Sequence, residues 1–306
     1  MPSILSADHF HSEEAAYRFV EERIWEKGRF CPHCGVVGKS GPLKGKSTRI
    51  GVYKCYACRK PFTVKIGTIF ESSHIKLHVW LQAIHLLCSS KKGMSTHQLH
   101  RVLGVTLQTA WFLSHRIREV MKDDGYVGPL GGAGVFVEAD ETFIGGKARN
   151  RAYRAPAPKK AVVSLIERNG RVRSQHVPEV NAANLRPILE AGIDKASHLR
   201  TDESGVYWKV GERFASHRTV THAQEEYVRG DASTNTAENF FSILKRGIYG
   251  TYQHVSEEHL HRYLAEFDFR HNNRMKLGID DVERADRALG GAVGRRLTYR
   301  TTHRSA

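Results

Sequence analysis

Four of the five cysteines form two pairs whose spacing suits a metal ion. Each pair has two residues between its cysteines, and twenty residues separate the pairs: Cys31, Cys34, Cys55 and Cys58. Two such turns bring four thiolates into a tetrahedron around one zinc ion, as in a zinc ribbon. Zinc also stabilises a small β module that could not otherwise bury enough surface to fold. We therefore predict that these cysteines hold one structural Zn²⁺.

A second group of candidate ligands consists of carboxylates. Asp140 and Asp202 end two predicted strands, and Glu238 opens a predicted helix 36 positions after Asp202. If one sheet gathers them, they can neutralise two divalent cations for phosphoryl transfer between DNA strands. An all-oxygen site favours Mg²⁺ or Mn²⁺. Spacing alone does not fix the set, because Glu138, on the same strand face as Asp140, or the adjacent Glu141 could supply a ligand instead.

The predicted helix that carries Glu238 also carries basic residues. Its apolar residues form one stripe, and Glu238 and Lys245, seven residues apart, share the adjacent face. The acid can therefore hold metal while Lys245, with Arg246 beside it, holds a DNA phosphate. The alternative is an ordinary surface helix with ion pairs.

A helical pair precedes these acids in the chain. Ser95 is predicted to cap a short helix, Gly104 to make a turn, and Thr106 to cap a longer helix. Helix, tight glycine turn and helix form the helix-turn-helix pattern, whose second helix can enter the major groove of DNA. The residues expected to point outward and contact DNA are Gln108, Thr109, His115 and Arg116. The alternative, a helical hairpin that only packs, is less favoured beside a basic zinc ribbon.

Charge indicates the class of partner. The 306 residues carry a net charge of +15, and residues 29–65 hold nine Lys or Arg and no Asp or Glu. Such an excess favours a polyanion, here double-stranded DNA. The chain has no apolar run of roughly 18 residues and no secretory signal, so we expect no membrane partner and a cytoplasmic, nucleoid-associated protein.

The order of the remaining predicted elements positions the acids. After a glycine-rich segment we predict strands at 135–140, 160–167 and 171–177, a helix at 182–191, a strand at 198–202, a helix from 203, a strand at 217–221 and a helix at 234–246. This is the order of elements in ribonuclease H. The predicted fold class is multidomain α+β: zinc ribbon, helix-turn-helix and a ribonuclease-H-like α/β catalytic domain. The predicted boundaries are an N-terminal helix at 1–29, zinc ribbon 30–73, helix-turn-helix 74–122, linker 123–134, catalytic domain 135–275 and a basic C-terminal tail 276–306.

Several long motifs in this order resemble one family. They are FCPHCG and YKCYACRKPFTVKIGTIF at the cysteines, VEADETFIGGK and RTDES at the aspartates, and TNTAENFFSILKRGIYGTYQHVSEEHLHRYLAEFDFRHNNR around Glu238. Over residues 30–274 the chain is similar to the bacterial insertion-sequence transposases of the ISXO type, which join a zinc ribbon to a DDE catalytic domain.

The resemblance implies that Asp140, Asp202 and Glu238 form the metal-binding triad and that Lys245 is the family's basic residue. It also implies cleavage and rejoining of DNA at the terminal inverted repeats of the element. Because DNA ends are held in pairs, we expect a homo-oligomer on DNA. Two other interpretations remain open: a zinc-ribbon regulator without catalysis, and a ribonuclease-H-like nuclease that cuts without joining.

Overall fold

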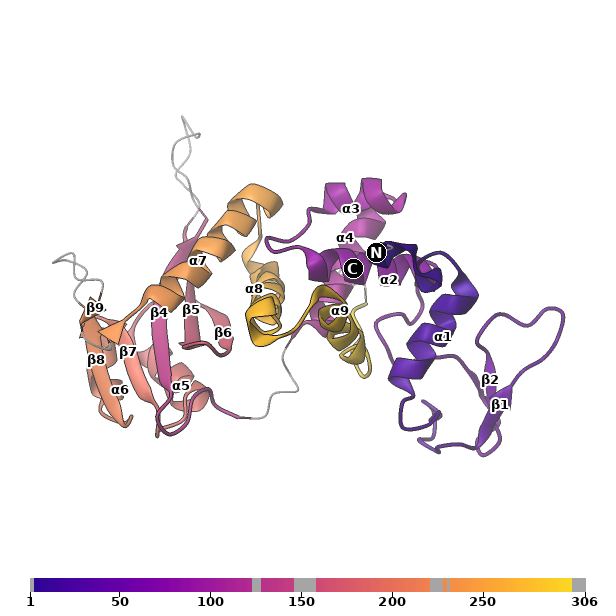
Figure 1. The fold of residues 1–306 in the computed structure, drawn as a ribbon, viewed down its shortest axis with the longest axis horizontal. Helices are drawn as coiled ribbons and strands as arrows, with labels where there is room; N and C mark the ends of the chain where they lie inside the picture. The colour runs from indigo at the N-terminus through magenta and orange to yellow at the C-terminus, as the bar shows by residue number, and fades with distance from the viewer. Residues whose placement is uncertain (1–2, 123–127, 146–157, 221–227, 230–231, 299–306) are drawn as a thin grey trace, which may run out of the picture. The chain divides into compact units, whose positions relative to one another are not determined.

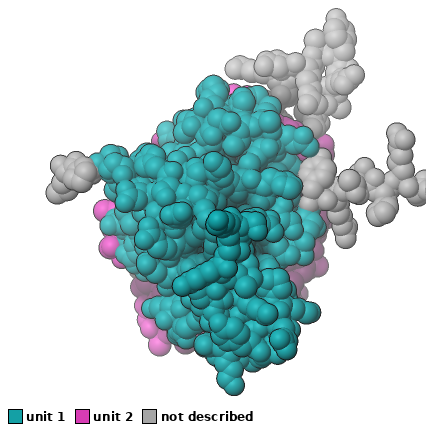
Figure 2. Space-filling model, turned by 90° about the vertical axis from the view of Figure 1, so that its right-hand side faces the viewer, with its two compact units in different colours: residues 1–121, 279–306 teal, residues 122–278 magenta. Residues whose placement is uncertain are grey.

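The computed structural model describes residues 3–122, 128–145, 158–220, 228–229 and 232–298 (Figure 1). The chain divides into two compact units (Figure 2): unit 1 joins Met1–Met121 to Ile279–Ala306, and unit 2 is Lys122–Gly278. Within the described residues, no helix has both the length and the apolar character needed to cross a membrane.

Unit 1 begins with a helix that packs on a small sheet. Two 3-10 turns, Ile4–Ser6 and Asp8–Phe10, precede α1 (Glu13–Ile24). The antiparallel sheet has the order β1-β2-β3, with the strands β1 (Ser40–Pro42), β2 (Tyr53–Cys55) and β3 (Pro61–Phe62). The Tyr53 hydroxyl donates to Glu21 of α1 at 2.7 Å, and the Trp25 ring lies edge-on to Tyr53. The N-terminal helix therefore belongs to the same packed region as the cysteines.

Three further helices belong to unit 1: α2 (Leu77–Ser89), α3 (Thr96–Leu103) and α4 (Leu107–Val120). The predicted caps are confirmed, because Ser95 accepts from Gln98 N and Thr106 accepts from Thr109 N, both at 3.2 Å. Gly104 ends α3 in the left-handed region, with φ of 65°, which a glycine adopts without strain.

The C-terminal segment, expected as a basic tail over 276–306, contains ordered structure. After a 3-10 turn (Met275–Leu277), Asp280 caps α9 (Asp281–Gly290), and its carboxylate accepts from Glu283 N at 2.8 Å. The helix packs against α2 in unit 1, and Arg284 donates to the Cys88 carbonyl at 2.9 Å. The basic composition of the segment conceals this capped amphipathic helix.

Unit 2 is built on a five-stranded mixed sheet in the order β6-β5-β4-β7-β8. Its strands are β4 (Phe136–Ile144), β5 (Lys160–Glu167), β6 (Val172–Val177), β7 (His198–Asp202) and β8 (Ser216–Val220). β4, β5 and β6 pair antiparallel, whereas β7 pairs parallel with both β4 and β8. The predicted order of strands is confirmed, and a short pair of strands, β9 (Val228–Arg229) and β10 (Ala232–Ser233), was not predicted.

Helices cover both faces of the sheet. One core lies between the sheet and α5 (Ala182–Gly192), a 3-10 turn (Gly205–Tyr207) and the short α6 (Trp208–Gly211). The other core lies against α7 (Asn235–Gly247) and α8 (Glu257–Asn272), which a π-helical turn (Ile248–Tyr252) separates. Alternate residues of β4 and β5 feed the two cores, as expected for a sheet covered on both sides.

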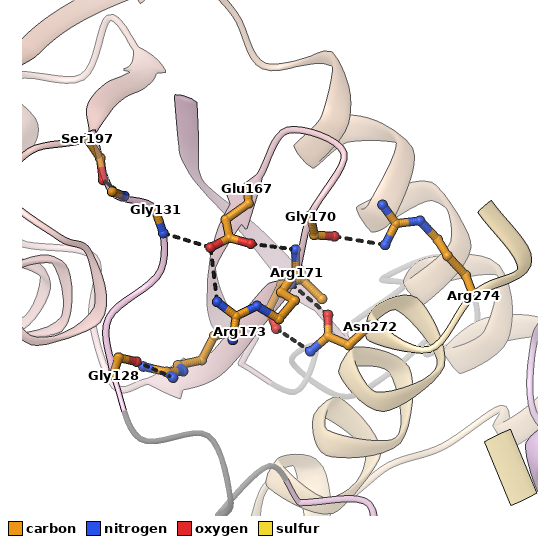
Figure 3. Close-up of polar contacts among 11 residues, drawn as sticks. Gly128, Gly131, Glu167, Gly170, Arg171, Arg173, Ser197, Asn272 and Arg274 are labelled. Carbon is orange, nitrogen blue, oxygen red and sulfur yellow. Dashed lines mark hydrogen bonds and ion pairs between the residues drawn. The ribbon is translucent and has the colours of Figure 1, made fainter. Parts of the chain in front are cut away.

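The described part of the expected linker is bound to unit 2. Leu130 forms a parallel bridge with Ile193, and Gly131 N donates to a Glu167 carboxylate oxygen at 2.7 Å (Figure 3). A Cβ at Gly131, where φ is +94°, would lie 2.0 Å from the Ser197 hydroxyl oxygen, so this close approach requires glycine. Residues 128–134 therefore extend the fold of unit 2, while 123–127 of the predicted linker lie outside the described residues.

Candidate functional site

The four paired cysteines come together in unit 1. Their sulfur atoms lie within 4.8 Å of one another, and the distances Cys31–Cys58 and Cys34–Cys55 are both 3.7 Å. Four thiolates at about 2.3 Å from a tetrahedral zinc ion stand roughly 3.8 Å apart. The thiolate cluster therefore fits one structural Zn²⁺.

The backbone around the second pair favours the thiolate form. Cys55 ends β2, and Cys58 N donates to its sulfur at 3.5 Å. This hydrogen bond, with a weaker one from Ala57 N, outweighs burial and lowers the pKa of Cys55 to about 7. Because metal ligation requires the thiolate, the turn prepares Cys55 for binding. The fifth cysteine, Cys88, lies buried in the core of unit 1.

The two aspartates lie on adjacent strands of unit 2. The last parallel pair between β4 and β7 joins Glu138 and Arg200. Continued for two more positions, the same register brings Asp140 opposite Asp202 on the same face. The prediction that Asp140 ends its strand is wrong, because β4 continues to Ile144 by pairing with β5. The parallel pairing of β4 with β7 does stop near Asp140, at Glu138. The side chain of Asp140 therefore lies beside the end of β7.

The structure separates the three acids of β4. Strand alternation directs Glu138 and Asp140 to the face covered by α7, and Glu141 to the opposite face. The Glu141 carboxylate accepts a hydrogen bond from the Tyr207 hydroxyl there. Glu138 is fully buried and accepts hydrogen bonds from Arg168 and from the backbone of α7. Asp140 is therefore the acid of this strand that faces Asp202 without being committed to another element.

Electrostatics indicate that acidic groups gather around Asp140. Burial raises its pKa, the hydrogen bond from Glu141 N opposes that rise, and the negative charges of Glu141, Asp202 and Glu238 add to it, giving a pKa of about 7. Carboxylates that destabilise one another in this way are stabilised by a bound cation. Carboxylate oxygens are the ligands that a hard divalent ion such as Mg²⁺ or Mn²⁺ prefers. Within the described residues, however, only the four cysteines bring their ligand atoms close enough together to hold a metal ion, so the structure does not assemble Asp140, Asp202 and Glu238 into a closed ligand set.

Helix α7 presents its polar residues as predicted. Ala237, Phe240, Phe241 and Leu244 are buried, whereas Glu238 in the first turn is exposed and Lys245 is half-buried. Arg246 is exposed, and its guanidinium donates to the Ser242 carbonyl at 3.0 Å and to the Ser242 hydroxyl at 2.8 Å. Glu238 thus lies in the first turn of α7 and Lys245 in its last turn, both outside the buried stripe.

The residues predicted to point outward from α4 divide into two pairs. Gln108 is exposed, and Thr109 is partly exposed at the capped start of the helix. The outward orientation of His115 and Arg116 is wrong, because both side chains are buried. The His115 ring packs on Trp111, and Arg116 donates to the Glu71 carbonyl at 2.8 Å. Only the first turn of α4 therefore retains candidates for contact with base edges.

Sequence reasoning missed Tyr207 and considered Glu138 only as a possible metal ligand, although both residues shape the acidic region in other ways. Tyr207, fully buried, fixes Glu141 through a hydrogen bond, and Glu138 binds the start of α7. A signal for Glu138 existed, because an acid within the apolar run VFVEAD must find donors if it is buried. The identity of those donors, which lie 30 to 99 positions away, could not be read from the local sequence.

Known proteins match both regions. The transposase zinc-ribbon domain family matches residues 11–61, and the ISXO2-like transposase domain family matches residues 129–272. Together these matches cover more than half of the chain. The chain is also similar to an uncharacterized protein in the transposable element ISH50 of Halobacterium salinarum, with 26% identity over 292 residues. That alignment spans 90% of this chain and 96% of the relative.

Proposed function

The chain belongs to the ISXO-type insertion-sequence transposases with an N-terminal zinc ribbon, and we propose that it cuts and rejoins the DNA ends of its element. In this proposal it binds the terminal inverted repeats, cleaves at the element end and joins that end to target DNA. Unit 1 supplies DNA binding and unit 2 supplies the chemistry.

We propose a ribonuclease-H-like fold for unit 2. The strand order supports it, since β4 has antiparallel neighbours on one side and parallel neighbours on the other. Helices on both faces, in the predicted order along the chain, support it further. In such a sheet the ends of adjacent parallel strands are a natural location for a site.

The observation that carries the proposal is the acidic edge of this sheet. Asp140 is level with Asp202 on neighbouring strands, and the charges of Asp202 and Glu238 help to raise the pKa of Asp140 to about 7. We infer that these three residues hold two divalent cations, Mg²⁺ or Mn²⁺. When bound, such cations neutralise the carboxylates and supply activation of the attacking oxygen and stabilisation of the leaving oxygen.

The proposed chemistry consists of two in-line displacements at phosphorus. Water first attacks the phosphodiester at the element end, so that a new P–O bond forms and the P–O3′ bond breaks, leaving a 3′ hydroxyl. That hydroxyl then attacks a phosphodiester of the target DNA and releases another 3′ oxygen, which takes up a proton. Lys245 and Arg246 are proposed to hold a phosphate of the bound strand beside Glu238.

We propose that unit 1 recognises the element ends. Helices α3 and α4 support a helix-turn-helix, in which Gln108 and Thr109 at the start of α4 contact bases. The basic segment 29–65, with no acidic residue, suits the phosphate backbone. Because two ends must be joined together, we expect at least two copies of the chain on DNA.

A strand-transfer assay tests the proposal. Zinc-loaded protein is incubated with Mg²⁺ and a duplex that carries an element end, and cut and joined products are separated by electrophoresis. We expect both products from the natural chain, and neither from Asp202→Asn, which should still shift the duplex in a binding gel. Cutting without joining would indicate a nuclease, and binding without cutting would indicate a regulator.

A further inference from the structure

Glu138 is a buried acid with an unusual number of donors. Its side chain is fully buried in unit 2. One carboxylate oxygen accepts from Arg168 Nε at 2.8 Å and from the Thr236 hydroxyl at 3.0 Å. The other accepts from Thr236 N at 2.9 Å and from Ala237 N at 3.0 Å. Both oxygens are therefore committed to donors that the sequence places at least thirty positions away.

These contacts cap helix α7. The helix begins at Asn235, and the side chain of the preceding Thr234 makes no capping hydrogen bond. The N–H groups of Thr236 and Ala237 would otherwise lack acceptors within the helix, and Glu138 satisfies both. The carboxylate also lies at the positive end of the helix dipole. Strand β4 therefore supplies the cap that the local sequence of α7 does not.

The capped turn is the one that carries Glu238. Glu238 follows directly after Ala237, whose N–H is bound to Glu138. Glu138 itself lies two positions before Asp140, on the same face of β4. The register between β4 and β7 sets Asp202 level with Asp140. One strand thus fixes Asp140 directly, Asp202 through pairing, and Glu238 through a buried carboxylate.

We propose that Glu138 is a positioning residue that sets the divalent-cation affinity of the acidic centre by fixing the turn that bears Glu238. The inference rests on the proposed function of that centre. A loose first turn in α7 lets Glu238 move away from the aspartates, so binding of a cation must then also restore the position of Glu238. Groups that orient metal ligands commonly change metal affinity about 10- to 100-fold when they are altered.

The variant Glu138→Gln tests the role of the charge at constant shape. A glutamine has one acceptor oxygen, and its amide group would face donors from α7 or from Arg168. The first turn of α7 should therefore open more often, and hydrogen exchange at Thr236 and Ala237 should accelerate. Mn²⁺ binding to the zinc-loaded full chain, followed by the electron paramagnetic resonance signal of free Mn²⁺, should weaken about 10-fold.

Glu167→Gln is the matched control. Glu167 is also a buried carboxylate of this sheet, and it accepts from Gly131 N, Arg171 N and the Arg171 guanidinium (Figure 3). None of these donors belongs to α7. Loss of its charge should lower the stability of unit 2 but leave Mn²⁺ affinity unchanged, because a general loss of stability does not alter the affinity of the folded fraction.

Thr236→Val is the milder second variant. It removes one donor to Glu138 but keeps the backbone N–H, so the chain should fold even if Glu138→Gln does not. Mn²⁺ affinity should fall roughly threefold, and the Mn²⁺ concentration for half-maximal cleavage should rise by the same factor. Unchanged affinity in both variants, or in Thr236→Val if Glu138→Gln is unfolded, would overturn the inference.

Asp202→Asn separates failure of this inference from failure of the proposed centre. If Asp202→Asn binds Mn²⁺ as tightly as the natural chain, the acidic centre is not the metal site and the proposed function fails. If Asp202→Asn loses binding while Glu138→Gln keeps it, the centre stands and the positioning role of Glu138 is wrong.

Discussion

Helices α2 and α7 lie in different units, yet both begin with a cap from a distant glutamate. Neither Lys76 before α2 nor Thr234 before α7 provides a side-chain cap. Glu13 of α1 accepts from Leu77 N at 2.8 Å and from His78 N at 3.2 Å. Glu138 of β4 accepts in the same way from the second and third residues of α7. Each unit therefore uses one acid to fasten a helix to a separate element.

The surroundings of the two acids differ. The side chain of Glu13 is 24% exposed and is paired with the His78 ring, whereas the side chain of Glu138 is 0% exposed and is paired with Arg168. A carboxylate removed from water needs its partners more, because nothing replaces them. In addition, the first turn of α2 leads into core residues, but the first turn of α7 carries Glu238. A cap from a distant glutamate therefore stabilises packing in unit 1 and, by our inference, orients a metal ligand in unit 2.

Removal of zinc should produce the largest difference in hydrogen exchange between the capped starts of α2 and α7. Zinc binding contributes on the order of 10 kcal/mol to folding of such modules, so chelation should unfold the β1–β3 sheet. Helix α1 packs on that sheet through Tyr53 and Trp25, so Glu13 should then release α2. Hydrogen exchange at Leu77 and His78 should accelerate, while exchange in the first turn of α7 stays constant. Zinc release can be followed with a chromogenic chelator.

One result of chelation would contradict the expected difference between the two helix starts. Equal acceleration of exchange at the starts of α2 and α7 would mean that the two caps respond together, and the comparison between them would fail. Re-addition of Zn²⁺ provides the control, since it should restore slow exchange at α2.

The next largest effect should be the difference in stability lost when each of the two glutamates is replaced by alanine. Glu138→Ala leaves Arg168 and two N–H groups of α7 without their buried acceptor, which we expect to cost about 3–5 kcal/mol. Glu13→Ala removes a partly exposed cap and should cost about 1 kcal/mol. Urea unfolding of each unit, resolved by hydrogen exchange, measures both losses. Similar losses at the two positions would show that burial does not distinguish them.

The stability of the packing around α2 and around α7 should also respond differently to acid, because His271 of α8 packs against α7. Burial, with a smaller contribution from the charge of Arg274, lowers the pKa of His271 to about 3, and its ring packs edge-on against Phe240 of α7. In the unfolded chain this histidine takes up a proton near pH 6.5, so stability present above that pH is lost as pH falls towards 3. Unit 2 should lose about 2 kcal/mol between pH 7.5 and pH 5 from this group.

His271→Phe isolates this contribution, because the loss of stability between those pH values should shrink by about 2 kcal/mol. His85 on α2 is the counterpart in unit 1. Burial lowers the pKa of His85, but the charge of Asp281 opposes it, so His85→Phe should change the pH dependence of unit 1 less. A pH dependence that survives unaltered in His271→Phe would assign the effect to other groups.

Features that depend on neighbouring residues were predictable from sequence. The spacing of the cysteine pairs predicts the cluster of four sulfurs, and the hydroxyl residues Ser95 and Thr106 predict the caps of α3 and α4. Short apolar runs bounded by turn residues predict the strands of unit 2, because strands buried on both faces, such as β5, consist mostly of consecutive apolar residues.

Features that depend on distant partners were not predictable. The cap of α2 comes from 64 positions upstream, and the cap of α7 from 98. Arg116 was expected to face DNA, but its guanidinium finds the Glu71 carbonyl 45 positions away. Likewise, β4 runs beyond Asp140 because β5 pairs with it, which no pattern within VFVEAD reveals. A single sequence contains the donors and acceptors but not their pairing.

The smallest effect should come from a cap that is local. Thr106 accepts from Thr109 N at 3.2 Å and donates to the Thr109 hydroxyl at 2.8 Å, both at an exposed helix start. In Thr106→Ala, water can replace these bonds, so we expect a loss of about 1 kcal/mol or less from unit 1, measured by urea unfolding. Thr106→Ser should restore most of it. If Thr106→Ala costs as much stability as Glu138→Ala, then the difference in solvent exposure does not explain the strength of the buried cap.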